Sequence, residues 1–380
     1  MTTLAAPGLS RADMSWTTEW RRTVDWPIVL AAVSLLGFGL LLSLAAGPPA
    51  AERIGYDNPY HLVIRHAVFV SGALVLLIGA SLMDRQWARR AAALMFFAAF
   101  ALMAVILLAG HEAKGAQRWI RLFGFSLQPS ELVKPALIVL VGWLLAQRQL
   151  FPSGPWAVLA VSFYGLTLVL LLLQPDVGQS ALLSAAFVLT FFIAGLPLRW
   201  AAGFGVLGTV LAGGLYATLP HVRQRLNSFI DPSAYDTYQI DKAAEAISRG
   251  GFLGAGPGEG TVKMSLPDAH NDFVYAVMGE EFGFLVALVV ICFYAFIALR
   301  GLGLAARIED PFPRAAATGL FILFGLQTVI NIGVNVALFP PKGMTLPLLS
   351  SGGSSLIGTA LTLGLALALV RRPPLARRRI

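Results

Sequence analysis

Ten long apolar stretches run through this 380-residue chain, separated by polar segments. A helix that crosses a bilayer needs about 20 mainly apolar residues, because its backbone polar groups must be satisfied within the helix. The chain is therefore predicted to be an all-α polytopic membrane protein with about ten transmembrane helices and both termini on one side. The predicted spans are residues 26–46, 62–82, 91–109, 131–147, 156–173, 178–195, 200–219, 273–299, 315–338 and 349–370.

The composition excludes several other classes of protein. Hydrophobic residues make up 57% of the chain and charged residues 13%, whereas a soluble domain carries about 25% charged residues. An ordinary soluble enzyme, a disordered chain and a disulfide-stapled secreted domain are all excluded. Because Cys292 is the one cysteine, neither an internal disulfide nor a cysteine-based metal site is expected.

Basic residues set the expected orientation. With both termini in the cytoplasm, 16 of the 28 Lys and Arg residues fall in inner loops and tails, as the positive-inside rule requires. The predicted organisation is a cytoplasmic tail over residues 1–25, a single transmembrane domain over 26–370 and a basic cytoplasmic tail over 371–380. Within that domain, residues 220–272 form a large extracytoplasmic loop between the seventh and eighth helices.

Three basic residues crowd a short outer loop against the usual charge bias. They are Lys114, Arg118 and Arg121. Such residues anchor an interfacial segment through snorkelling side chains, or they form a site for an anionic group. The sequence leaves both interpretations open.

Carboxylates gather at the outer ends of the predicted helices, where burying a charge in lipid costs about 2.5 to 3.5 kcal/mol. Glu131 and Lys134 open the fourth span with i,i+3 spacing, so they share one face and are expected to pair. Asp176 lies in a tight turn between Pro175 and Val177, where Asp is also common for structural reasons. Asp272 ends the long outer loop, and the helix dipole favours an acid there.

Other polar residues lie within the predicted spans. Glu280 and Glu281 come two turns after Asp272, about 12 Å along a helix, so one of them is expected to pair or to face a cavity. One face of the ninth span carries Gln327, Asn331 and Asn335, and interhelical hydrogen bonds explain that face adequately.

The last outer connection is irregular in sequence. Prolines and glycines between Pro340 and Pro347 precede a run of small residues over Ser350–Ser355. Irregular backbone survives near a membrane only where protein covers it or where it lines a wet cavity. The small residues also permit close helix packing, so both roles stay open.

The long outer loop contains a predicted helix over Tyr238–Arg249. Its expected apolar side is formed by Tyr238, Ile240, Ala244 and Ile247, which favours an interfacial or docking helix. The glycine-rich run Gly254–Gly260 follows no evident strand, so it is interpreted as a flexible turn rather than a phosphate loop.

Taken together, the motifs resemble the SEDS family (shape, elongation, division and sporulation proteins) over about residues 25–370. The division branch is favoured over the elongation branch by Gly279 and by the stretch 342–347. Asn271 replaces a usual Thr, and Phe339-Pro340 replaces a common Leu-Pro-Thr; neither change removes a charge. The matching motifs are Lys114–Ile120, Gln128-Pro129-Ser130-Glu131 with Lys134, Gln174-Pro175-Asp176 with Gly178, His270-Asn271-Asp272-Phe273, Gly279-Glu280-Glu281, Pro341–Pro347 and Ser351–Ser355.

The resemblance implies a peptidoglycan glycosyltransferase that polymerises lipid II at the outer face of the cytoplasmic (inner) membrane, at the division septum. It implies a class B penicillin-binding protein transpeptidase of the FtsI type as partner, together with division regulators such as FtsQLB and FtsN, and no nucleic acid. Glycosyl transfer needs a base for the acceptor hydroxyl and positive charge for the departing undecaprenyl pyrophosphate.

The resemblance also assigns roles to residues. Asp272 is expected to be the general base. The expected pyrophosphate-binding and substrate-binding residues are Arg118, Lys134, Lys342, Lys114 and Ser351. Supporting or cation-binding roles fall to Glu131, Asp176 and Glu281. No cofactor is certain: a divalent cation, Mg²⁺ or Mn²⁺, is compatible with pyrophosphate and carboxylates, but the sequence names no cage for it.

Three alternatives remain at this point. The chain could be a lipid II flippase, which needs a polar route open to both sides of the bilayer. It could be an elongation-type polymerase of the same family. It could be a non-catalytic division scaffold, in which Asp272 would be dispensable.

Overall fold

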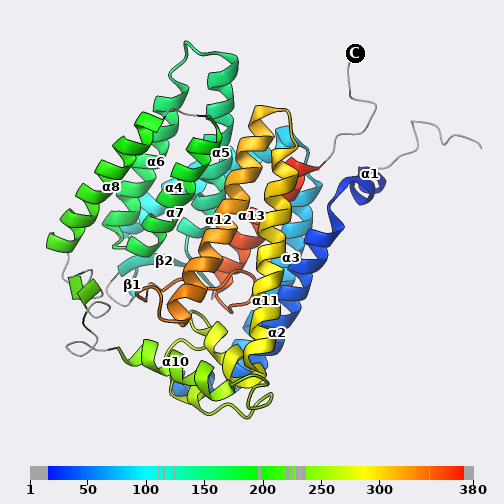
Figure 1. The fold of residues 1–380 in the computed structure, drawn as a ribbon, viewed down its shortest axis with the longest axis vertical. Coiled ribbons are helices and arrows are strands. Elements are labelled where there is room, and N and C mark those ends of the chain that lie inside the picture. The colour runs from blue at the N-terminus through cyan, green and yellow to red at the C-terminus, as the bar shows by residue number, and fades with distance from the viewer. Residues whose placement is uncertain are drawn as a thin grey trace, which may run out of the picture.

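The computed structural model describes residues 16–109, 111–113, 116–122, 125–195, 198–218, 223–224, 226–227, 231, 237–341 and 343–371. Its body is a bundle of long helices (Figure 1). Within the described residues, eight helices are long and apolar enough to cross a membrane, and Val177–Ile193 and Ala202–Thr218 are shorter apolar helices. The predicted polytopic helical architecture is confirmed. The helices at the predicted spans are α2 (Trp26–Ile54), α3 (His61–Leu82), α4 (Arg85–Ala109), α5 (Ser130–Leu150), α6 (Trp156–Leu173), α7 (Val177–Ile193), α8 (Leu198–Thr218), α11 (Val274–Ala306), α12 (Pro311–Asn335) and α13 (Gly353–Val370).

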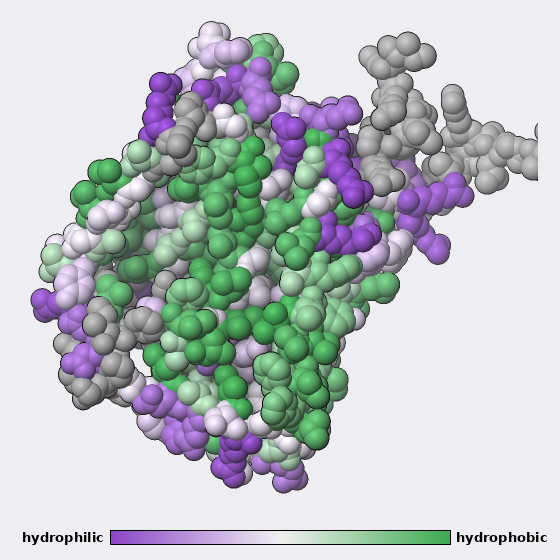
Figure 2. All heavy atoms as spheres, in the orientation of Figure 1, coloured by the Kyte–Doolittle hydropathy of each residue, from purple (hydrophilic) through white to green (hydrophobic). Residues whose placement is uncertain are grey.

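The outside of the bundle is suited to lipid. Figure 2 shows apolar side chains along the middle of the visible face and hydrophilic ones toward its two ends. Val75 on α3 and Leu94 on α4 are 71% and 74% exposed, although both are large apolar residues. Such a surface is stable only against hydrocarbon, so the chain is a multi-pass membrane protein.

Three mostly buried helices, α5, α12 and α13, form the centre of the bundle. Glycines let them approach closely. A Cβ on Gly142 of α5 would lie 2.7 Å from the backbone of Ala316 on α12, and one on Gly358 of α13 would lie 2.6 Å from the carbonyl oxygen of Glu131. Close contact through small residues is the usual way in which membrane helices pack.

The first span is longer than predicted. The expected end at residue 46 is wrong, because α2 continues through Pro48 and Pro49 to Ile54 and ends at Gly55, whose φ is 88°. Its last turn is held from outside the helix: the Arg53 guanidinium donates to the carbonyls of Leu266, at 2.8 Å, and of Met264. These tertiary bonds stabilise the last turn of a helix that loses two internal hydrogen bonds one turn earlier, at Pro48 and Pro49.

The segment between α4 and α5 contains a three-stranded antiparallel sheet, which the sequence did not predict. Its strands are β1 (His111–Ala113), β2 (Ala116–Leu122) and β3 (Phe125–Leu127), in the order β1-β2-β3. In the β2–β3 register, Arg121 pairs with Ser126 and Ile120 with Leu127. The sheet satisfies backbone polar groups at the end of the bundle, where lipid gives way to water.

The helix predicted within residues 220–272 is present as α10 (Tyr238–Gly250). A further short helix, α1 (Trp16–Thr23), precedes the first span. The predicted apolar side is correct only in part: Ile247 packs against the core and Ile240 is half-buried. Ala243, Ala246 and Gly250 are buried, whereas Ala244 and Tyr238 are exposed. A Cβ on Gly250 would lie 1.9 Å from the carbonyl oxygen of Gly279, so at this position α11 approaches too closely for any residue larger than glycine.

The glycine-rich run after α10 forms a turn only in part: the N–H of Glu259 donates to the Gly256 carbonyl, whereas Ala255 and Gly256 pair with α11. Helix α11 is broken at Gly283, whose φ and ψ are 78° and 179°. Residues 251–256, which we call the strap, form hydrogen bonds with the backbone of α11 on both sides of the break. The N–H of Ala255 donates to the Glu280 carbonyl at 2.8 Å, and the N–H of Phe284 donates to the Gly251 carbonyl at 2.9 Å. In an unbroken helix Phe284 would donate to Glu280, so the strap replaces the lost helical bond.

The close α5–α12 contact gives a test of the bundle. Substitution Gly142→Ala should lower the free energy of unfolding by about 1–3 kcal/mol, because the added methyl group overpacks a backbone contact. The matched control is Gly165→Ala in α6, where a Cβ meets nothing within 4 Å. Thermal unfolding of the detergent-purified variants measures both. Equal unfolding temperatures for the two variants would contradict the packing described here.

Candidate active site at one end of the bundle

Polar side chains from five helices and the β-sheet converge at one end of the bundle. This end carries the start of α5, α7, α11 and α13 and the end of α12. It faces α10 and the sheet, whereas α1 and the last turn of α13 lie at the opposite end (Figure 1). The site is described below as a buried charged network, an arginine–aspartate pair beside it, and a loop segment that contains Asp272.

The buried charged network is built around the pair predicted from i,i+3 spacing. Lys134 Nζ lies 2.8 Å from Glu131 Oε2, and both residues are almost fully buried. Gln179 of α7 joins them: its Nε2 donates to Glu131 Oε1 at 2.6 Å, and its Oε1 accepts from Lys134 at 2.8 Å. Each charge is therefore compensated, as burial at low dielectric requires.

Arg118 and Asp176 lie beside this network. Strand β2 carries Arg118, whose Nε donates to the Gln174 carbonyl at 2.7 Å and whose guanidinium lies 3.7 Å from Asp176 Oδ1. Gln128 Nε2 donates to Asp176 Oδ2 at 3.0 Å. Burial raises the pKa of the Asp176 carboxyl, and the Arg118 guanidinium opposes that shift. The predicted turn role of Asp176 is also real, since its side chain caps α7 by accepting from the N–H of Gln179.

One face of α12 connects the charged network to the segment that contains Asp272. Lys134 Nζ donates to Gln327 Oε1 at 3.4 Å, and Gln327 Nε2 in turn donates to the Thr345 carbonyl at 3.3 Å. One helical turn further, Asn331 Nδ2 donates to the Asp272 carbonyl at 2.9 Å, and Asn335 Nδ2 donates to the same carbonyl at 3.0 Å. The predicted interhelical hydrogen bonding of this face is confirmed.

Hydrogen bonds to backbone carbonyls hold the segment that contains Asp272. Ser351 Oγ donates to the His270 carbonyl at 2.7 Å, and Ser350 Oγ donates to the Asn271 carbonyl at 2.6 Å. Asp272 itself is half-buried. Its Oδ2 lies 3.7 Å from where a Cβ on Gly343 would stand, so the carboxylate faces the irregular connection between α12 and α13.

Two predicted site residues, Lys114 and Lys342, lie outside the described residues. A third, Glu281, lies apart from the charged network: it is buried and forms an ion pair with Lys263. Glu280 next to it accepts from the backbone N–H groups of Thr261 and Val262, at 2.7 Å each, and of Lys263, at 3.0 Å. The prediction that one of the two glutamates pairs is confirmed, and both are in fact compensated.

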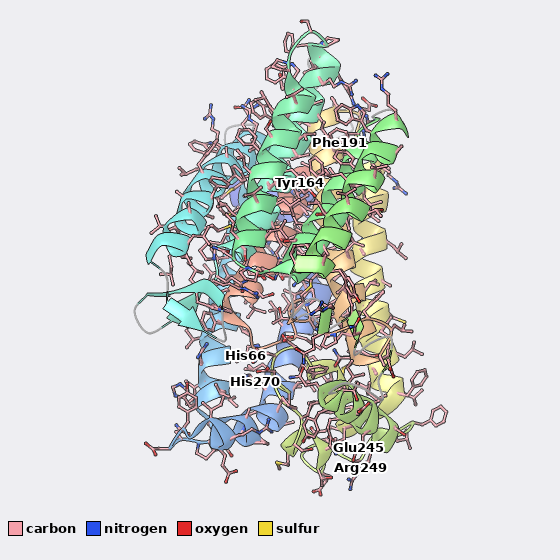
Figure 3. The ribbon with its side chains drawn as sticks, turned by 90° about the vertical axis from the view of Figure 1, so that its left-hand side faces the viewer. His66, Tyr164, Phe191, Glu245, Arg249 and His270 are labelled. Atoms are coloured by element: carbon pink, nitrogen blue, oxygen red, sulfur yellow. The ribbon has the colours of Figure 1, made fainter. Side chains whose placement is uncertain are left out.

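Sequence reasoning missed three contributors. Lys263 and Gln179 are both long-range partners of buried glutamates, and the only available signal was that a buried carboxylate needs a partner. The third is His66 on α3, which is 1% exposed and whose ring nitrogens have no hydrogen-bond partner in the described part of the chain. It lies beside His270 (Figure 3) and interacts with it electrostatically.

The carboxylates do not converge on a common point that fits a resident metal ion. Searching the described ranges finds no group of three or more His, Cys, Asp or Glu side chains placed to hold one. The oxygens of Glu131 accept from Lys134 and Gln179, and those of Asp176 face Arg118 and Gln128. These carboxylates are therefore occupied by cationic and amide donors from neighbouring elements.

Fold and site together define a polytopic membrane protein whose polar side chains meet at one membrane boundary. The family model FTSW_RODA_SPOVE, described as cell cycle protein, matches residues 26–373. The chain therefore belongs to this family, which confirms the SEDS resemblance.

Relatives agree with the family over nearly the whole chain. A protein of Caulobacter vibrioides named probable peptidoglycan glycosyltransferase FtsW is 43% identical over 98% of this chain and 96% of its own length. A protein of the same name from Geobacter metallireducens is 35% identical over 90% of this chain and 93% of its own length.

Solved structures share the fold. One, titled for the structural coordination of polymerization and crosslinking by a peptidoglycan synthase complex, superimposes with a TM-score of 0.75 at 28% identity. It covers 91% of this chain and 97% of its own. Thermus thermophilus RodA, a rod shape determining protein, superimposes with a TM-score of 0.66 at 26% identity, covering 91% of this chain and 96% of its own.

The buried charged network predicts how much stability is lost when one member of the Lys134–Glu131 pair is removed and how much returns when both are replaced. Lys134→Met should destabilise the protein by about 3–5 kcal/mol, because it leaves the Glu131 charge buried without its cation. The double substitution Glu131→Gln with Lys134→Met should recover most of that loss. Chemical unfolding in detergent, followed by circular dichroism, measures both.

An exposed pair with the same spacing provides the control. Lys242 and Glu245 form an i,i+3 pair on α10 at 2.6 Å, with exposed side chains. Lys242→Met should leave the unfolding midpoint unchanged, because water screens a surface pair. If Lys134→Met and Lys242→Met unfold at the same midpoint, the buried network does not contribute as described.

Proposed function

We propose that this chain is a peptidoglycan glycosyltransferase of the FtsW type, which polymerises lipid II at the outer face of the cytoplasmic membrane during cell division. The names of the relatives support the reaction class, and 43% identity over 98% of the chain supports the FtsW branch over the RodA branch. The single observation that carries the proposal is the placement of Asp272, half-buried at one membrane boundary and backed by the buried Lys134–Glu131 pair.

The reaction follows from that placement. The Asp272 carboxylate takes the proton of the acceptor sugar hydroxyl, whose oxygen then forms the new glycosidic bond to the donor anomeric carbon. The bond from that carbon to the pyrophosphate breaks, and undecaprenyl pyrophosphate leaves with the electron pair. Positive charge is needed there, since two phosphate groups must accommodate the developing charge.

The basic residues divide between contact and positioning. The Arg118 side chain is 28% exposed and therefore accessible to a pyrophosphate, and Lys342 belongs to the connection that the Asp272 carboxylate faces. Lys134 is 2% exposed and already compensated, which supports a positioning role through Glu131 and Gln327. Ser351 holds the His270 carbonyl, which supports a positioning role for the Asp272 segment.

The orientation and partners are also proposed. The positive-inside distribution supports cytoplasmic termini, which puts the Asp272 end outside the cell, where lipid II head groups are polymerised. The solved complex that coordinates polymerization and crosslinking supports a penicillin-binding protein of class B as partner. Regulation by FtsQLB and FtsN, and location at the inner membrane of the septum, rest on the family resemblance.

The bundle interior favours this enzyme over a flippase. Below the charged network, α5 presents Leu137, Val139 and Leu140 and α12 presents Leu320 and Phe321, all buried. These apolar layers separate the network from the opposite end of the bundle. A flippase would need a polar route through them for a charged head group.

The decisive substitution is Asp272→Asn. Purified wild-type protein, with its transpeptidase partner, should convert lipid II into glycan strands, and the variant should polymerise at least about 100-fold more slowly, because the amide cannot accept the proton. Gel analysis of labelled strands gives the rate. The control is Asp268→Asn, four residues earlier, where φ is 50° and Asn adopts this left-handed conformation readily.

Other outcomes point to other functions. Unchanged strand yield with Asp272→Asn removes Asp272 as the base. Translocation of lipid II across liposomes without any strand formation by the wild type would support the flippase instead.

A further inference from the structure

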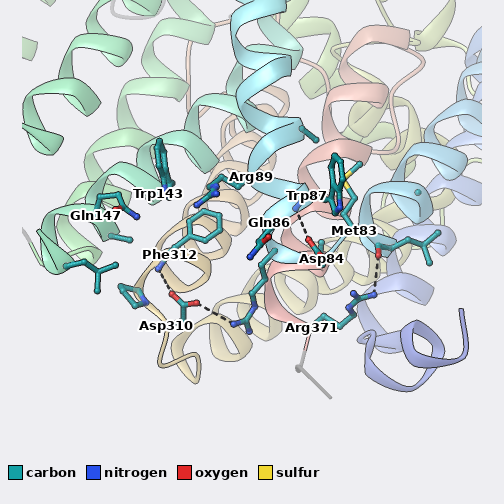
Figure 4. Close-up of a pocket in the computed structure, with 18 of the residues that line it drawn as sticks. Met83, Asp84, Gln86, Trp87, Arg89, Trp143, Gln147, Asp310, Phe312 and Arg371 are labelled. Carbon is teal, nitrogen blue, oxygen red and sulfur yellow. Dashed lines mark hydrogen bonds and ion pairs between the residues drawn. The ribbon is translucent and has the colours of Figure 1, made fainter. Parts of the chain in front are cut away.

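A large cavity opens at the end of the bundle opposite to Asp272, and the proposed function does not use it. Its volume is 1180 Å³. It lies among the last turns of α3, α5 and α13 and the first turns of α4 and α12 (Figure 4). The distribution of basic residues places this end on the cytoplasmic side of the membrane.

Most charges around the cavity compensate one another. Arg85 lies 3.7 Å from Asp310, and the Arg371 guanidinium donates to the Leu82 carbonyl at 3.4 Å. Glu19 and Asp84 interact electrostatically with Arg371. The three carboxylates at the cavity are thus matched by Arg85 and Arg371.

Arg89 is the cation that remains. Its guanidinium carbon lies 5.2 Å from the ring centroid of Trp143, and no ion pair to Arg89 occurs in the described ranges. Trp143 Nε1 is itself buried and has no hydrogen-bond partner there. Figure 4 shows the two side chains next to each other at one wall. A cation and an indole N–H without an acceptor therefore lie together, and an anionic oxygen is the acceptor suited to both.

The remaining lining indicates what carries that anion. Leu82, Met83, Leu150 and Phe312 supply apolar walls at the helix ends. Trp and Arg at the ends of membrane helices lie at the level of lipid headgroups. A small free anion would leave most of a cavity of 1180 Å³ and its apolar walls without contact.

We propose that this cavity binds the phosphodiester headgroup of a glycerophospholipid of the inner leaflet, with Arg89 and Trp143 Nε1 donating to the phosphate oxygens. The apolar walls then receive the first part of the acyl chains. The site is independent of the glycosyl-transfer site, because buried apolar layers of α5 and α12 lie between them.

The test is lipid retention by the full-length protein. Protein purified in a mild detergent and exposed to phosphatidylglycerol is examined by native mass spectrometry, which counts bound lipids. The wild type should retain phosphatidylglycerol, and Arg89→Gln and Trp143→Phe should each reduce its affinity roughly tenfold, as expected for losing a hydrogen bond to a charged group. Trp143→Phe keeps an aromatic ring beneath Arg89 and removes the indole N–H, with some loss of ring volume.

The matched control is Arg90→Gln. Arg90 is the neighbouring arginine on α4, is exposed and lies over Trp87 with its guanidinium carbon 5.3 Å from the ring centroid, and it does not line the cavity. The Arg90→Gln variant should retain phosphatidylglycerol as the wild type does. An equal loss with Arg90→Gln would mean general attraction to basic residues and would overturn the proposed site, as would unchanged retention in both Arg89→Gln and Trp143→Phe.

A second arm distinguishes the source of the phosphate. Thermal unfolding is followed with short-chain dioctanoyl phosphatidylglycerol or with inorganic phosphate at the same concentration. Stabilisation by the lipid alone, lost in Trp143→Phe, supports the proposal. Equal stabilisation by inorganic phosphate would overturn the assignment to a lipid headgroup. If Arg89→Gln does not fold, Trp143→Phe decides the question by itself.

Discussion

The ion pair between Lys134 and Glu131 is the interaction on which the arrangement of the site depends. Buried charged groups need hydrogen-bond partners in addition to each other. Gln179 of α7 and Gln327 of α12 supply these partners to the pair. Gln327 continues to the carbonyl of Thr345 in the irregular connection before α13. Three helices and a loop are thereby fixed relative to one another by the need to compensate one lysine.

Asn331 and Asn335 show how the same helix supports the proposed base without using its side chain. Both amides donate to the backbone carbonyl of Asp272 rather than to its carboxylate. An anchor of this kind fixes the position of the Asp272 backbone, and with it the region in which the carboxylate lies. This division between anchoring and chemistry is typical of preorganised sites, in which supporting bonds restrict motion of the reacting group.

The fold could largely be predicted from the sequence, because apolar length alone determines membrane-spanning helices. The pairing of Glu131 with Lys134 also followed from local spacing. What could not be predicted depends on contacts distant in sequence. The end of α2 is set by Arg53 bonding to the carbonyl of Leu266, and the partner of Glu281 is Lys263, from a loop that follows α10. The buried side of α10 was predicted only in part: Ile247 packs against Gly279, but the close approach of Gly250 to the Gly279 carbonyl could not be read from the composition of the helix.

The strap over residues 251–256 has a consequence for how this protein can vary. Its N–H groups and carbonyls replace the hydrogen bonds that α11 loses at Gly283, and successive residues of the strap pair with successive residues of the helix. Its length is therefore fixed by the helix rather than by the loop in which it lies. Adding or removing a residue between Gly250 and Gly256 would shift every pairing and leave helical carbonyls unsatisfied at the membrane boundary. Insertions that most surface loops tolerate should be rare at this point, although it belongs to the longest connection in the chain.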